Sequence, residues 1–368
     1  MIMKRLIIDV DDTICKTENG DYKNSLPNKE LVGKPDNEML EFINSCPVCN
    51  STKCEYLYTN LKDTLYNTGG LWNLNKCTNC HSAYLNPRYN LASIINAYDT
   101  YHTHESCGNL NSQGDVGVIT LLKNKIISRY IDFRFMGNRS FYGLISYILV
   151  LLKPTTKSSL DIKYRNLPII DGGKSLLDVG FGDGKFLNDA ESIGWKTLGI
   201  DIDNKVISNA LEIGLNVKQA NIEDLGKDEI FNYITLSHVI EHLHDPITTI
   251  RSLHDLLDSG GKLWIQTPNI NAYSHSETKI NWRGIEAPRH LVLFNHQSLK
   301  KLLLECGFEK VSIYHGNNLS TYEWMTKNST DGVNTHRPKS FIANFIHKTK
   351  ILMAKNKSEF ITVVATKY

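Results

Sequence analysis

Three glycines spaced by two residues form the clearest candidate ligand site in the chain. An apolar run over 175–179 predicts a strand and leads directly into Gly180, Gly182 and Gly184, after which a helix is expected. Glycine allows a sharp turn from strand to helix and lets a cofactor approach the backbone closely. Asp201 ends a second apolar run, where a carboxylate can bind both hydroxyls of a ribose. The pattern therefore predicts a ribose-containing cofactor.

This glycine spacing resembles motif I of class I methyltransferases that depend on S-adenosylmethionine (SAM), whereas dinucleotide folds space their last two glycines by three. The resemblance implies that Asp178 orients the loop or contacts the SAM ammonium through water, and that Asp201 binds the ribose. Asn221, followed by Ile222, stands where relatives often carry an acidic residue for the adenine amino group. An amide oxygen can still accept that hydrogen bond.

A second group of candidate residues follows the expected fourth strand. Asp245 and Pro246 are typical of the start of a helix, so His238, Glu241 and His242 lie before it, at the catalytic edge, as candidates for a general base. The segment resembles a group that includes quinone O-methyltransferases and surface-sugar methyltransferases. In the quinone enzymes a similar set can hold a divalent metal. The alternative is that Glu241 and His242 only brace the loop.

A third segment, 282–294, resembles the tail of the same methyltransferase group and is expected to roof the substrate pocket. His290 is the first choice for the base that removes a proton from a substrate hydroxyl. Arg283 and Arg289 are expected to bind a substrate phosphate or carboxylate, the alternative being ordinary surface charges.

Four cysteines form two pairs of the Cys-x-x-Cys type: Cys46 with Cys49, and Cys77 with Cys80. The N-terminal residues lack a signal-peptide cleavage site, so we expect a cytoplasmic protein whose paired thiolates bind zinc. A closed site of four cysteines is structural. The stretch resembles the zinc ribbon that precedes many bacterial methyltransferases of polysaccharide clusters.

The first strand-like segment carries a different resemblance. Asp9 and Asp11 match motif I of haloacid-dehalogenase (HAD) phosphatases, which implies a nucleophile and an acid/base used with magnesium. The later motifs of that family have no room before the cysteine pairs. We therefore expect an inactive remnant or a piece that docks to other polysaccharide-synthesis enzymes, the alternative being residual phosphate or magnesium binding.

Alternating strand and helix patterns predict an α/β fold with a doubly wound, Rossmann-like parallel sheet, preceded by the small zinc ribbon and a helical segment. The expected domains are a HAD-like fragment, the ribbon, a helical lid or linker, the SAM-binding domain and a C-terminal segment with the last strand, over 1–45, 46–90, 91–170, 171–320 and 321–368. Strands are expected over 175–179, 197–200, 217–220, 233–236, 262–266, 310–315 and 360–366, and helices over 185–193, 205–213, 246–257 and 297–306.

The apolar run over 141–152 is shorter than the roughly 20 residues of a membrane span. We expect a buried or lid helix there, with a shallow membrane contact as the alternative. Bulk composition adds an exclusion: the net charge is +2, and no run of Lys or Arg exceeds two residues, so a nucleic-acid partner is not expected.

Together these patterns predict a SAM-dependent enzyme that O-methylates a precursor of a capsule or other surface polysaccharide. The acceptor would be a sugar, a nucleotide-linked sugar or a small phosphorylated precursor. Two rival classes are a nucleic-acid methyltransferase that uses the ribbon to grip RNA, and a SAM-binding scaffold without catalysis.

Overall fold

The computed structural model describes residues 35–98, 118–169, 173–226, 228–314, 319–327, 341–354 and 356–368. The HAD-like segment with Asp9 and Asp11 lies outside these residues, so its role stays a prediction.

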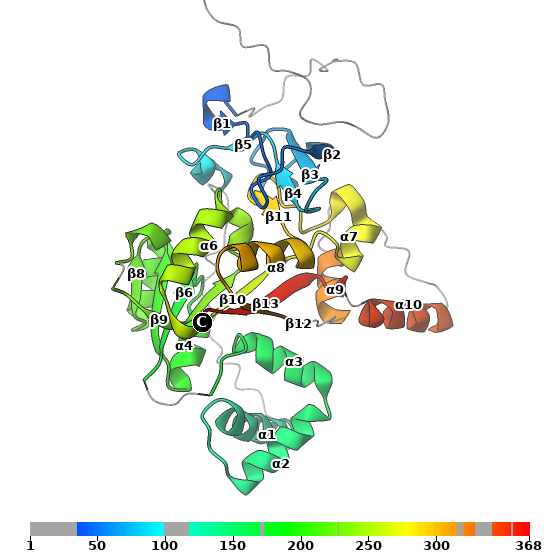
Figure 1. Cartoon of the computed structure of the whole chain (residues 1–368). Helices are drawn as coiled ribbons and strands as arrows, with labels where there is room; N and C mark the ends of the chain where they lie inside the picture. Colours follow the sequence, from blue (N-terminus) through cyan, green and yellow to red (C-terminus); the bar gives the residue numbers. More distant parts are fainter. Residues whose placement is uncertain are drawn as a thin grey trace, which may run out of the picture.

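A seven-stranded sheet forms the centre of the molecule, in the order β12-β13-β10-β9-β6-β7-β8 (Figure 1). Every strand expected from residue 175 onward is present: β6 (Ser175–Val179), β7 (Lys196–Asp201), β8 (Val217–Gln219), β9 (Phe231–Ser237), β10 (Leu257–Pro268), β12 (Lys310–Tyr314) and β13 (Phe360–Thr366). The expectation of a parallel sheet is wrong for β13, which runs antiparallel to β10 and β12. The chain leaves the sheet at the end of β12 and returns to it at the same edge, beside Tyr314, so β13 runs in the opposite direction.

Helices cover both faces of this sheet, because successive side chains of a strand point to opposite faces. Leu176 packs in a core with the helices after β6 and β7, whereas its neighbour Leu177 packs in the other core, with the helices after β9 and before β12. The helices are α4 (Lys185–Ser192), α5 (Asn204–Glu212), α6 (Pro246–Asp255) and α8 (His296–Glu305). The predicted doubly wound α/β fold is confirmed.

The N-terminal cysteine region forms a small antiparallel sheet in the order β11-β4-β3-β2. One edge strand of this sheet, β11, comes from far downstream in the sequence, from the segment predicted to roof the substrate pocket. The cysteine region and the C-terminal α/β part of the chain therefore share one sheet. The strands are β2 (Cys54–Leu61), β3 (Trp72–Cys77), β4 (Ala83–Leu85) and β11 (Val292–Leu293), and beside them β1 (Leu40–Glu41) pairs with β5 (Arg88–Tyr89).

Three helices form a lobe on the opposite side of the central sheet from the cysteine region: α1 (Val118–Arg134), α2 (Phe141–Leu151) and α3 (Pro154–Lys163) (Figure 1). Of the two expectations for 141–152, a buried helix is wrong, because α2 packs on one side only and most of its apolar side chains are exposed, and a lid helix stays a prediction. Among the described residues, no helix combines the length and apolar character needed to cross a membrane. The remaining helices are α7 (Tyr273–Thr278), α9 (Leu319–Lys327) and α10 (Phe341–Met353).

Candidate cofactor and catalytic site

The glycine loop after β6 requires glycine at all three positions. Gly180, Gly182 and Gly184 have φ values of 64°, 61° and 70°, a left-handed backbone that other residues rarely adopt. A Cβ on Gly180 would lie 2.7 Å from the Val239 side chain, and one on Gly184 would lie 2.5 Å from Leu215. A Cβ on Gly182 would meet no atom within 4 Å. Gly182 therefore borders the open space in front of α4, where a cofactor can approach the backbone.

Asp178, the acidic residue of the same motif, is fully buried. Its Oδ1 accepts hydrogen bonds from Arg165 and, at 2.8 Å, from the Thr235 hydroxyl, while its Oδ2 has no partner among the described residues. Burial raises the pKa of Asp178, and the Arg165 charge opposes that rise. An unpaired buried carboxylate oxygen beside the glycine loop suits the predicted contact with the SAM ammonium.

Arg165 is a residue of this site that the sequence did not single out. It precedes β6, has a left-handed φ of 44°, and its guanidinium lies 3.8 Å from the ring centroid of Phe186. No local pattern distinguishes it from a surface arginine, because its role depends on a carboxylate that becomes buried only in the fold.

The two other predicted cofactor residues lie at the same edge, at the ends of β7 and β8. Burial raises the pKa of Asp201, while backbone N–H groups of Asp203 and Gly182 favour its charged form. Asn221 is exposed and its side chain bonds Asp224, capping the short 3₁₀ helix that begins at the buried Ile222. The predicted SAM residues are thus brought to one edge of the sheet, and their contacts with ribose and adenine stay predictions.

His238 and Glu241 form a hydrogen-bonded pair directly after β9. His238 Nδ1 lies 3.2 Å from Glu241 Oε1, and Glu241 Oε2 accepts a hydrogen bond of 2.9 Å from the Thr267 hydroxyl. Burial alone would raise the pKa of Glu241, but the hydrogen bond and charge of His238 outweigh it and hold the pKa at about 2. The His238 side chain is 38% exposed, so a buried carboxylate orients an accessible imidazole.

His242 and His290 also lie beside Glu241, and the three side chains have ligand atoms within 4.8 Å of one another. His290 Nδ1 lies 2.8 Å from the Gly284 carbonyl oxygen, and His242 Nδ1 lies 3.0 Å from that of Arg289. This arrangement could hold a divalent metal. His290 is 7% exposed, and burial lowers its pKa to about 4. The first choice for the base is therefore an enclosed imidazole, whereas His238 is accessible.

Arg289 is not on an accessible surface, where the predicted contact with a substrate would require it. Its side chain is fully buried and makes a two-pronged ion pair with Asp63, at 2.8 and 2.9 Å. It also donates to the Ala97 carbonyl oxygen at 3.1 Å and to Glu286 at 3.2 Å. The pairing of β11 with β4 holds this segment against the cysteine region, so its arginine joins the two parts of the protein. Arg283 bonds Glu286 and borders a cavity of about 170 Å³; its substrate role stays a prediction.

A larger cavity of about 400 Å³ lies between the helical lobe and the carboxyl edge of the central sheet. It adjoins the pair of His238 and Glu241 through two residues of its wall. The Phe360 ring lies 4.7 Å from the His238 ring between centroids, and the Gln266 carbonyl oxygen accepts a hydrogen bond of 2.9 Å from the backbone N–H of His238. No sequence motif predicted this cavity. Its polar lining residues include Lys157, Asp161, Asn166, Gln266, Glu359 and Thr362.

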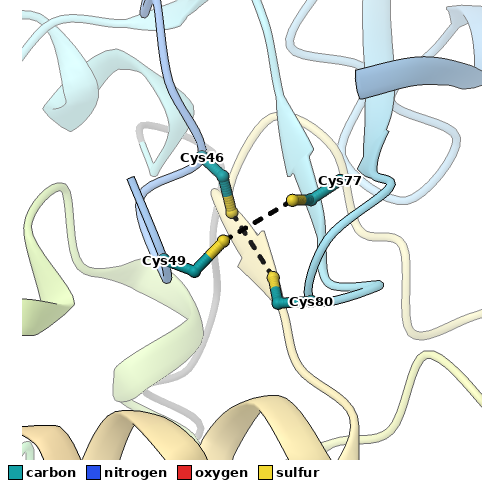
Figure 2. Close-up of side chains that lie close together, drawn as sticks. All are labelled: Cys46, Cys49, Cys77 and Cys80. Carbon is teal, nitrogen blue, oxygen red and sulfur yellow. Dashed lines mark hydrogen bonds between the residues drawn. The ribbon is translucent and has the colours of Figure 1, made fainter. Parts of the chain in front are cut away.

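The four paired cysteines converge on one point, as Figure 2 shows. The Sγ atoms of Cys46 and Cys80 are 3.6 Å apart, as are those of Cys49 and Cys77. Tetrahedral zinc with bonds of about 2.3 Å would need sulfur separations of about 3.8 Å. No cross-linking disulfide joins these four thiols. The cluster could therefore hold zinc with no open coordination position.

Comparison with known proteins gives a consistent picture for part of the chain. Residues 157–313 match a family model described as a methyltransferase domain. The ubiquinone biosynthesis O-methyltransferase of Nitrosospira multiformis is 32% identical over 111 residues, which cover 28% of this chain and 46% of that protein. The enzyme of the same name from Pseudomonas syringae pv. tomato is 35% identical over 108 residues, covering 27% and 46%.

This chain thus spans about half the length of the curated relatives it matches. Among solved structures, a SAM-dependent methyltransferase from Archaeoglobus fulgidus aligns with a TM-score of 0.40 and 20% identity, over 62% of this chain and 100% of that one.

Proposed function

We propose that this protein, whose residues 157–313 form a class I methyltransferase domain, transfers a methyl group from SAM to a hydroxyl of a small acceptor. One observation carries the proposal: the glycine loop with Asp178 and Asp201 lies at the same sheet edge as the His238–Glu241 pair and a polar cavity. Oxygen is the favoured methyl acceptor because the matched relatives carry the name O-methyltransferase.

His238 is the proposed proton acceptor. When bound, SAM supplies a methyl group on a positively charged sulfur, ready for direct displacement. Glu241 holds His238 through Nδ1, which leaves Nε2 free to take the proton of the acceptor hydroxyl as the carbon–oxygen bond forms. The cavity walls position the acceptor in line with the methyl group and limit access of water. In this proposal, the cavity walls position the acceptor, and His238, held by Glu241, removes its proton.

The proposed acceptor is a saccharide precursor of a surface polysaccharide. The lining of the larger cavity supports this, because Lys157, Gln266 and Thr362 can hydrogen-bond hydroxyl groups and Lys157 can also contact a phosphate. The resemblance of the cysteine region to ribbons of polysaccharide-cluster methyltransferases points the same way. We further propose that zinc on the four cysteines stabilises the N-terminal sheet and takes no part in catalysis.

The first test is calorimetric titration of the zinc-loaded protein with SAM, for the natural chain and for Asp201→Ala. Micromolar binding that the substitution abolishes would support the cofactor site, and no binding by a folded natural chain would overturn the methyltransferase proposal. Transfer of labelled methyl to sugar-nucleotide extracts then tests the acceptor. Labelling of a phenolic acceptor instead would replace the saccharide proposal.

The role of His238 is tested by His238→Gln in the same transfer assay. General-base catalysis contributes about 10²–10⁴-fold, so kcat should fall by at least that lower figure while SAM binding is retained. His290→Gln is the matched comparison, because His290 also contacts the Glu241 cluster but is enclosed. If kcat falls more for His290→Gln than for His238→Gln, and both variants bind SAM equally well, His290 would be the base instead.

A further inference from the structure

The outer face of α2 is a continuous apolar stripe without a partner among the described residues. Phe141, Leu144, Ile145, Ile148 and Leu152 recur at the spacing of one helix face, and their exposed fractions are 72%, 43%, 39%, 49% and 74%. The opposite face, with Gly143, Ser146 and Val150, is the one that packs on the lobe. So large an apolar helix face is unusual on a protein surface and marks an interaction site.

Basic side chains flank this stripe. Arg139 and Lys153 flank α2 at its two ends and are exposed, and Arg129 lies over the Tyr142 ring at 4.7 Å. Residues 118–163 contain eight Lys or Arg and two Asp, a formal charge of +6 in a chain whose net charge is +2. The lobe that carries the apolar stripe therefore has a net positive charge, whereas the rest of the chain is net acidic.

We infer that α2 docks the protein on the surface of an anionic phospholipid bilayer. An apolar helix face with basic residues around it inserts among lipid headgroups while the basic side chains contact anionic lipid. Phe141–Leu151 has 11 residues, about half of the length that spans a bilayer, so the helix lies in the interface. A protein partner for the stripe would need an apolar groove with acidic groups around it. An anionic bilayer supplies an apolar interior and negatively charged headgroups across its whole surface.

Docking there would bring the larger cavity close to the bilayer, because Leu151 at the end of α2 lines that cavity together with Pro154 and Lys157. A saccharide acceptor carried on a membrane lipid could then reach His238 without leaving the surface. This consequence rests on the proposed function, whereas docking itself does not.

The test is co-flotation of the full-length, zinc-loaded protein with vesicles of phosphatidylcholine alone or with 30% phosphatidylglycerol, in low and high salt. The chain should float with anionic vesicles and dissociate as salt rises. The double variant Ile145→Glu/Ile148→Glu should bind at least ~50-fold more weakly, since two apolar anchors are lost and two like charges are added. Arg139→Gln/Lys153→Gln should lose about fivefold per charge.

The matched control is Leu211→Glu/Ile213→Glu at the end of α5, where the side chains are 55% and 67% exposed and lie outside the lobe. It should float like the natural chain. Circular dichroism and SAM titration of each variant separate a docking defect from misfolding or a failed cofactor site. Absence of flotation by the natural chain, or equal flotation of Ile145→Glu/Ile148→Glu, would overturn the inference. A dimer in light scattering that only this variant dissociates, without vesicle binding, would assign the face to a second copy instead.

Discussion

Asp63 and Arg289 join two parts of the chain that are 226 residues apart, and their ion pair predicts a large cost for Asp63→Asn. Burial would raise the pKa of Asp63, but the hydrogen bonds and charge of Arg289 hold it at about 2, below the ordinary 3.8. That difference corresponds to roughly 2.5 kcal/mol of stability at neutral pH. Because the folded pKa is depressed, this stability is complete above pH 3.8 and is lost as the pH falls towards 2.

Asp63→Asn also leaves a buried guanidinium without its main partner, and breaking one side of a buried pair costs about 3–5 kcal/mol. Arg289 retains Glu286 at 3.2 Å and the Ala97 carbonyl oxygen at 3.1 Å, so we expect the lower end, about 3 kcal/mol. The free energy of unfolding is measured by urea titration followed by tryptophan fluorescence. Trp72 and Trp282 are buried in the two parts that the ion pair joins.

A double-mutant cycle with Arg289→Met separates the pair from the general cost of each change. We expect a coupling energy of about 2–3 kcal/mol at pH 7 that decreases as the pH approaches 3. Glu305→Gln is the control, because its ion pair with Lys301 is exposed and should contribute no more than about 0.5 kcal/mol. A coupling below about 0.5 kcal/mol would refute the reasoning, since the buried pair would then behave like a surface pair.

Three further predictions concern the cofactor loop, the cysteines and one buried carboxyl. Gly182→Ala should weaken SAM binding at a folding cost of only about 1 kcal/mol, whereas Gly184→Ala should cost more stability because its Cβ meets another side chain at 2.5 Å; calorimetry and urea titration compare the two. Cys49→Ser should lower the zinc content by inductively coupled plasma analysis and expose Trp72, and unchanged fluorescence would contradict a structural metal. Burial raises the pKa of Glu359 to about 7 from 4.5, so folding stability should fall as the pH rises between these values. Glu359→Gln should therefore gain about 1–3 kcal/mol at pH 8 and nothing at pH 4, and equal gains at both pH values would exclude this cause.

Local sequence was sufficient for features that depend on neighbouring residues. The three glycines predicted a sharp turn from strand to helix because glycine adopts a left-handed backbone far more readily than other residues, and all three have positive φ. Asp245 and Pro246 predicted the start of α6, where the Asp245 side chain accepts the Thr248 N–H. The alternation of short apolar runs with segments of helical periodicity likewise predicted the strands and helices of the central sheet. The reason is that burial of one face of an element requires apolar residues at the spacing of that element.

Only the tertiary structure decided which polar groups meet across long separations. Arg289 and Asp63 carry no mutual signal in the chain, so a residue expected on the substrate surface became a buried link once β11 joined the cysteine region's sheet. Arg165 meets Asp178 only because the fold places both side chains together beside β6. The sequence of 141–152 showed that the segment is apolar but not which side would be covered, since exposure depends on what the rest of the fold places beside a helix.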